Sequence, residues 1–138
     1  MVPDHLLRFP TRAAIDALAL RFDLPNTPQM QDWEFEVADA NRIDEFLSAY
    51  QSQELTDDER FTLMEMIIQS FEDLGESLQA DNRWQSAIDL LDANIRLHAH
   101  SVWYWSCLEE SGSGDLFFVS PSIRVLLQKH FADLIKSK

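Results

Sequence analysis

The segment from Asn82 to Leu108 contains neither glycine nor proline, and its apolar residues recur every three or four positions. That period is typical of an α-helix with one buried face. At 1.5 Å per residue, one helix of this length would span about 40 Å. The sequence therefore predicts a long central helix over about 82–108. A break near His100 is the alternative, because the aromatic run Val102–Trp105 would also suit a strand.

Shorter helices are indicated by apolar periodicity between turn residues. The clearest begins after Thr56, where Thr56 and Glu59 have the spacing of a capping box. Gly75 is suited to the position just after its end. Short strands are suggested by alternating residues at 33–37 and by the residues at 115–119. The fold class expected is all-α or mainly α: a compact bundle of about five helices, the shorter ones over about 11–23, 43–50, 57–74 and 121–135.

Length and composition fit one folded domain over residues 1–138. Of these residues 46% are hydrophobic and 11% aromatic, which is enough apolar material for a core. The single cysteine, Cys107, excludes an intrachain disulfide and favours a reducing compartment, so we expect a cytoplasmic protein. No uninterrupted apolar stretch resembles a signal peptide or a membrane span.

Negative charge is concentrated in one part of the chain. Fourteen acidic residues and two basic residues lie between Asp32 and Glu76, so this segment carries −12 of the total charge of −13. A concentrated negative field repels nucleic acid and anionic lipid, and it attracts basic protein surfaces. We therefore expect a basic protein partner, no nucleic acid and no membrane.

The densest carboxylates are predicted to form an acidic ridge on the helix after Thr56. Glu72 and Glu76, four residues apart, repel each other on a helix, which is easier to explain if a cationic partner neutralises them. The other explanation is that these charges only keep the protein soluble. The predicted ridge consists of Asp57, Asp58, Glu59, Glu65, Glu72 and Glu76.

An aromatic pocket is the second candidate binding site. Convergent polar groups in an aromatic cavity would bind a small molecule or support an enzyme. At helical spacing, however, aromatic residues are more often part of a core. The candidate pocket residues are Trp84, His98, Trp103 and Trp105.

No residue pattern predicts a catalytic residue, a metal or a cofactor. His98, His100, Cys107 and Glu109 are close in sequence, but His98 and His100 would point about 200° apart on a helix. Residues 111–114 (Ser-Gly-Ser-Gly) lack the flanking residues of a nucleophile elbow or a phosphate loop and are expected to form a turn.

The sequence favours a non-catalytic interaction protein whose acidic ridge binds a basic protein surface. In physical type it is similar to small acidic proteins that neutralise basic toxins, and so to immunity proteins and antitoxins. The alternatives are a small-molecule binder or enzyme with the aromatic pocket, and a self-associating protein. In the latter, Leu63 and Met66 of the segment Phe61–Leu74 would complete a homodimer contact.

Overall fold

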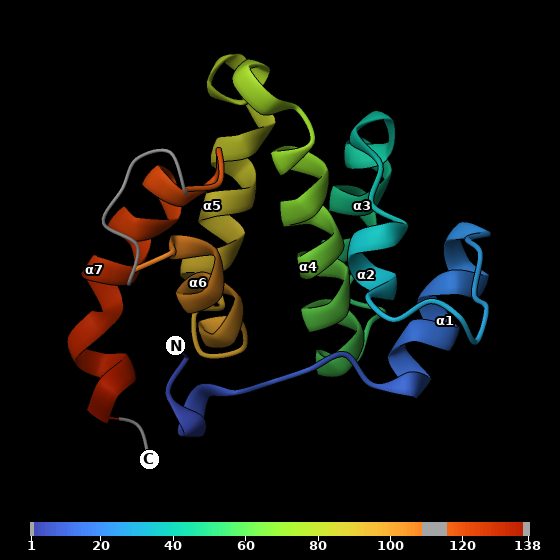
Figure 1. The fold of residues 1–138 in the computed structure, drawn as a ribbon, viewed down its shortest axis with the longest axis horizontal. Helices are drawn as coiled ribbons and strands as arrows, with labels where there is room; N and C mark the ends of the chain where they lie inside the picture. The colour runs from blue at the N-terminus through green and yellow to red at the C-terminus, as the bar shows by residue number, and fades with distance from the viewer. Residues whose placement is uncertain (1, 109–115, 137–138) are drawn as a thin grey trace. The chain divides into compact units, whose positions relative to one another are not determined.

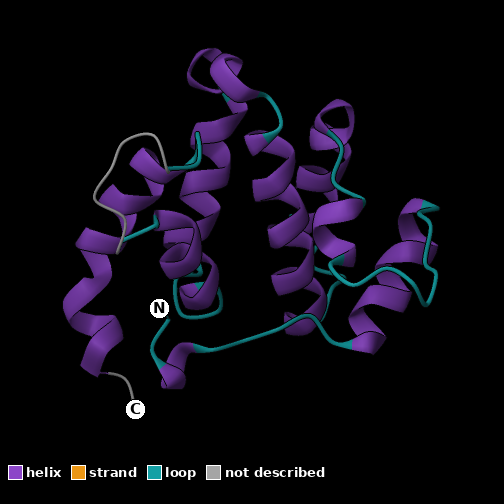
Figure 2. Ribbon diagram, in the orientation of Figure 1, coloured by secondary structure: helices purple, strands orange, loops and turns teal. Residues whose placement is uncertain are grey.

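The computed structural model describes residues 2–108 and 116–136, and every regular element in these ranges is helical (Figures 1 and 2). The mainly α fold class is confirmed. The chain divides into two units by its contacts. The N-terminal unit is Phe9–Asp73, and the C-terminal unit is Leu74–Lys138 together with Met1–Arg8. A single domain over 1–138 stays a prediction.

The N-terminal unit is organised around one helix, α4 (Asp57–Glu72). The other helices of the unit, α1, α2 and α3, each contact α4. Every side chain from Phe61 to Ile68 is buried, as expected of a helix that its neighbours surround. The remaining elements are α1 (Arg12–Phe22), α2 (Trp33–Glu36), the 3₁₀ helix η2 (Ala40–Arg42) and α3 (Ile43–Tyr50).

Helix α1 has the ends that its sequence predicts. The Thr11 hydroxyl oxygen accepts from the backbone N–H of Ala14, which satisfies one of the free donors at the helix start. At the other end Asp23 has a left-handed backbone, with φ of 56°, and the N–H of Leu24 donates to the carbonyl of Ala19 at 2.9 Å. This is the reversed last turn that commonly ends a helix.

Helix α4 begins with the predicted capping box. The Thr56 hydroxyl oxygen accepts from the N–H of Glu59 at 3.1 Å, and the Glu59 carboxylate accepts from the N–H of Thr56 at 3.0 Å. Gly75 has the positive φ, 59°, that its residue type favours after a helix end.

The predicted continuous helix over 82–108 is wrong, because the C-terminal unit contains two helices in this segment. Helix α5 (Arg83–Ala93) ends before Asn94, whose side-chain amide donates to the carbonyl of Leu90 at 2.9 Å. Such local side-chain bonds compete with helix continuation. Turns connect it to α6 (Ala99–Ser106). The apolar period continues across these turns, so the break is not visible in the pattern.

The strands suggested at 33–37 and 115–119 are also wrong where the structure describes them. Trp33 begins the one-turn helix α2, and both Trp33 and Val37 are buried. Their spacing of four positions suits a helical turn as well as an alternating strand. Residues 116–119 form a bend and a turn, and residue 115 lies outside the described residues.

Hydrogen bonds connect α7 (Ser120–Lys136) to the other helices of the C-terminal unit. The Ser120 hydroxyl donates to the carbonyl of Trp105 at 2.7 Å, and the Arg124 guanidinium donates to the carbonyls of Ser106 and Cys107. Arg124 thereby caps the end of α6. Asp92 of α5 accepts from Lys129 and His130 of α7. The unit also contains the 3₁₀ helices η1 (Asp4–Leu6) and η3 (Gly75–Ala80).

The capping box predicts a measurable stability loss. Thr56→Ala removes the hydroxyl that accepts from Glu59, and it should lower the free energy of unfolding by about 1 kcal/mol. Urea denaturation followed by circular dichroism measures the change. The control is Thr27→Ala, at an exposed loop threonine, which should change stability by less than about 0.5 kcal/mol. Equal effects of the two substitutions would contradict the capping role.

Candidate functional site

The N-terminal unit holds almost all of the excess negative charge. Residues 9–73 contain fifteen carboxylates and four arginines, a formal charge of −11. In this range, all of which the structure describes, each arginine forms an ion pair with a carboxylate of the same unit. The pairs are Arg12–Asp16 at 3.8 Å, Arg21–Glu54 at 3.0 Å, Arg42–Glu45 at 2.7 Å and Arg60–Asp57 at 3.9 Å.

Arg42 contacts both α1 and α3. Two of its nitrogens donate to the two carboxylate oxygens of Glu45, at 2.9 and 2.7 Å, and one also donates to the carbonyl of Phe22 at 2.8 Å. Its guanidinium lies 5.9 and 5.6 Å from the ring centroids of Phe22 and Phe46. The side-chain hydrogen bond to Arg42 lowers the pKa of Glu45, and the same bond raises the pKa of Arg42. Arg42 therefore joins the end of α1 to the start of α3.

The planar geometry at Arg42 predicts that charge alone will not replace it. Arg42→Lys keeps the charge but loses the two-oxygen contact and the bond to the α1 end, so it should lower the free energy of unfolding by about 1–2 kcal/mol. Chemical denaturation measures this. Arg12→Lys is the matched control, since its pair is exposed and long, and it should cost less than about 0.5 kcal/mol. A fully stable Arg42→Lys variant would contradict this role.

The predicted acidic ridge is not one exposed surface. Asp57 and Asp58 are exposed in the first turn of α4, but Glu59 is used in the capping box. Glu65, predicted to be on the polar face, is only 4% exposed and so is not available to a partner. Glu72 is half-buried, and Glu76 is exposed but lies in η3 of the C-terminal unit.

Glu34 of α2 is another carboxylate with an unexpected environment. It is only 9% exposed, and desolvation by burial raises the pKa of its carboxyl, to which the nearby charges of Asp32 and Glu36 add. The predicted strand would have placed Glu34 on a solvent face. The helical turn instead removes it from water.

The raised pKa of Glu34 predicts a pH-dependent stability cost. The folded state holds the proton more tightly than the unfolded state, so stability falls as pH rises from the unfolded pKa through the folded pKa, and it stays reduced at neutral pH. Glu34→Gln should therefore raise the melting temperature at pH 7 and lose this fall with pH. Thermal melts between pH 4 and about 8 measure it.

The matched control for Glu34 is Glu36→Gln, which changes an exposed carboxylate on the same helical turn. Glutamine retains an oxygen that accepts from the N–H of Asp32, as Glu36 does at 3.0 Å. If Glu36→Gln raised the melting temperature as much as Glu34→Gln, the effect would come from net charge and not from burial.

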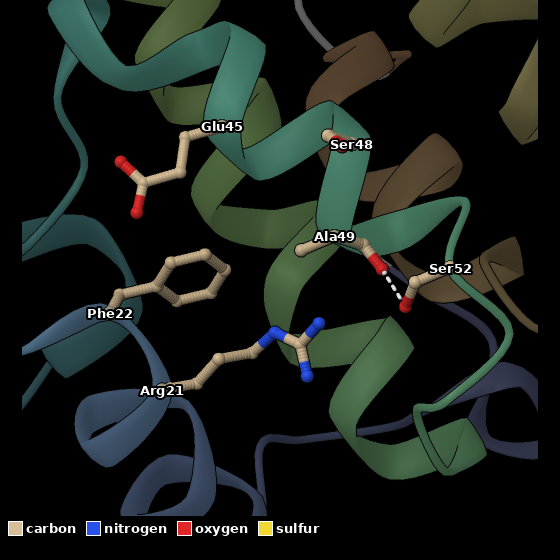
Figure 3. Close-up of a pocket in the computed structure, with 6 residues that line it drawn as sticks. All are labelled: Arg21, Phe22, Glu45, Ser48, Ala49 and Ser52. Atoms are coloured by element: carbon tan, nitrogen blue, oxygen red, sulfur yellow. Dashed lines mark hydrogen bonds between the residues drawn. The ribbon is translucent and has the colours of Figure 1, made fainter.

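A crevice of about 300 Å³ lies between α1 and α3 (Figure 3). Arg21 and Glu45 lie on either side of the Phe22 ring in this view, and the Ser52 hydroxyl donates to the carbonyl of Ala49 at 2.7 Å. The two charged side chains of the crevice already form ion pairs, because Arg21 pairs with Glu54 and Glu45 pairs with Arg42. The crevice therefore has charged walls but no nucleophile with an adjacent base. It is lined by Arg21, Phe22, Glu45, Ser48, Ala49 and Ser52.

The structure places all four residues of the predicted aromatic pocket in the C-terminal unit and buries each of them. They are Trp84, His98, Trp103 and Trp105.

Trp103 and Trp105 face different neighbours. Trp103 stacks on Phe131 of α7, with ring centroids 5.4 Å apart, whereas the Trp105 ring lies 4.6 Å from that of Phe117. Two positions on a helix are about 200° apart, so these rings cannot line one pocket. They pack in the core.

Buried polar atoms on α6 do not converge either. Ser101 Oγ and Trp103 Nε1 have no hydrogen-bond partner among the described residues. Such groups can mark a ligand or water site. However, the two residues are again about 200° apart, so they do not face a common site.

The histidines near α6 have separate environments. His98 is fully buried, whereas His100 is half-buried and its Nδ1 accepts from the backbone N–H of Arg8 at 3.4 Å. Desolvation lowers the pKa of His100. Cys107 ends α6 with a left-handed backbone, and Glu109 lies outside the described residues. Within the described ranges, no group of three or more His, Cys, Asp or Glu side chains could hold a metal ion.

Leu63 and Met66, the residues suggested for a homodimer contact, are fully buried within the chain. They therefore cannot form that contact from the surface of α4. None of the helices in the described part of the chain has the length and apolar content that crossing a bilayer requires.

The sequence pattern did not single out Leu20 as an exposed residue. Leu20 of α1 is 86% exposed, the highest value among the large apolar side chains that the structure describes. It lies off the apolar period set by Leu18 and Phe22, which face the core. This offset from the apolar period is the sign in the sequence that Leu20 is exposed.

No family model matches the chain, and no curated protein or solved structure is detectably similar to it. The function must therefore be argued from its side chains.

Proposed function

We propose that the protein is a non-catalytic interaction protein of the cytoplasm whose N-terminal unit binds a basic surface of another protein. One observation carries the proposal. The structure describes all of residues 9–73, and each of the four arginines in this range forms an ion pair with a carboxylate of the same unit. The unit has eleven more carboxylates than arginines.

Exposed carboxylates are found on several elements of the N-terminal unit. Asp23 follows α1, Asp32 precedes α2, and Asp44 and Asp58 lie in the first turns of α3 and α4. An excess of like charge disfavours a compact fold, and a cationic surface would offset that effect. Such a field would also speed association with a basic partner.

The same charge disfavours the other partners. DNA, RNA and anionic lipid would be repelled, and two copies of the unit would repel each other. In this respect the proposed function is immunity- or antitoxin-like, because those proteins are commonly acidic and bind basic targets. A reducing compartment suits the single cysteine, Cys107.

The test is affinity capture from a lysate of the source organism with two charge-reversal variants. One variant carries Asp32→Lys, Asp44→Lys and Asp58→Lys in the N-terminal unit. The control carries the same total charge change in the C-terminal unit. Its substitutions are made at exposed positions and are Asp4→Lys, Glu76→Lys and Asp89→Lys.

We expect the wild type and the control to retain a basic protein at low salt and to release it as salt rises, because salt screens the attraction. The N-terminal variant should lose that protein. Loss from both variants alike would show that only the total charge matters. Capture of no basic protein by the wild type would contradict the proposed function.

A further inference from the structure

Residues 2–8 form a strap on the C-terminal unit. By its contacts Met1–Arg8 belongs to this unit, although Phe9–Asp73 separates it from the rest of the unit in sequence. The strap, dark blue in Figure 1, contains the single turn of η1. The structure describes all of residues 2–8, and none of their side chains is fully buried. Because so little apolar area is buried, polar contacts are important for holding the strap in place.

Two histidine rings hold the strap through hydrogen bonds. Nε2 of His5 donates to the carbonyl of Leu134, near the end of α7, at 2.8 Å. Nδ1 of His100, on α6, accepts from the backbone N–H of Arg8 at 3.4 Å. A carbonyl oxygen only accepts, so His5 has a proton on Nε2. A backbone N–H only donates, so Nδ1 of His100 has no proton.

The two hydrogen bonds respond differently when the rings are protonated. A protonated imidazole donates at both nitrogens and accepts at neither. His5 would still donate to Leu134 through Nε2, whereas His100 would direct an N–H at the N–H of Arg8. Protonation of His100 therefore removes one hydrogen bond of the strap and places two donors against each other.

The environment of His100 favours its neutral form. The residue is half-buried, and desolvation by burial lowers the pKa of its imidazole. The Tyr104 ring, one turn further along α6, lies parallel to it with the ring centroids 6.5 Å apart. The other titratable and charged groups on the described elements around His100 are Asp4, His5 and Arg8 of the strap, Arg96 and His98 before α6, and Asp133 and Lys136 of α7, beside Leu134. Their charges adjust the pH at which His100 titrates, but only a proton on Nδ1 removes the acceptor for Arg8.

We propose that His100 makes the strap pH-sensitive: the neutral imidazole holds residues 2–8 on the C-terminal unit, and the protonated imidazole releases them. With the strap bound, the chain is attached to the C-terminal unit on both sides of Phe9–Asp73. After release, the N-terminal unit is attached through the bond between Asp73 and Leu74 alone. The inference is independent of the proposed function and adds a means of regulating how the two units are tethered.

The strap is held more tightly as pH rises. His100 binds a proton less tightly when the strap is bound, because only the neutral ring can accept from Arg8. Binding of the strap is therefore strongest above the pKa of the free imidazole, about 6.5. It weakens by up to about tenfold per pH unit as pH falls from that value toward the lowered pKa of His100.

The test follows the Arg8 amide of the full chain by NMR between about pH 5 and 8. Its protection from solvent exchange, corrected for the intrinsic exchange rate, measures how often the strap opens. His100→Gln retains a side-chain oxygen that can accept from Arg8 but does not titrate. His5→Gln is the matched control, because its side-chain amide can still donate to Leu134 while His100 is unchanged.

In the wild type we expect the protection of the Arg8 amide to fall about tenfold between about pH 7.5 and 5.5. The fall should have the same midpoint as the titration of the His100 ring signals. His5→Gln should show the same fall, whereas His100→Gln should remain protected over the whole range.

Three results would overturn the inference. Constant protection of the Arg8 amide in the wild type would show that the strap does not respond to pH. A fall that persists in His100→Gln, or that His5→Gln abolishes, would assign the response to another group. Different midpoints for the Arg8 amide and the His100 ring would show that protonation of His100 does not release the strap. This last comparison needs only the wild type, so it decides the matter even if a variant fails to fold.

Discussion

The ion pairs between arginines and carboxylates of residues 9–73 are the interactions that connect several elements of the N-terminal unit. Its arginines do more than reduce the charge, because three of them lie where elements meet. Arg42 joins the end of α1 to α3, Arg21 joins α1 to Glu54 in the segment after α3, and the Arg60 guanidinium lies 5.0 Å from the Tyr50 ring centroid, joining α4 to α3. Most carboxylates of the unit remain exposed, whereas Glu34 and Glu65 are buried.

Local signals made part of the fold predictable. The hydroxyls of Thr11 and Thr56 cap helices that begin within one residue of the expected positions, because a cap depends only on neighbours three residues away. The prediction of one long helix over 82–108 was wrong because α5 ends at Ala93, with a side-chain bond from Asn94 to Leu90 at its end, while the apolar period continues. The prediction of a strand at 33–37 was wrong because a spacing of four residues between buried positions suits both a strand and a helical turn, and these residues form α2, which contacts α4.

The candidate site was less predictable than the fold, because exposure depends on tertiary packing. The sequence located the charge but counted Glu65 and Glu34 as surface groups, and both are buried. It could not show that Arg42 pairs with Glu45 and also caps α1, since that bond joins elements twenty residues apart. Leu20 was visible only as a leucine outside the apolar period of α1.

In protein contacts, charge mainly raises the association rate, whereas buried apolar side chains supply most of the affinity. Carboxylates exposed on several elements can attract a basic protein from any direction, but a diffuse field cannot fix its orientation. Under the proposed function, the excess charge of the N-terminal unit would account for the attraction of a basic protein but not for the orientation in which it binds.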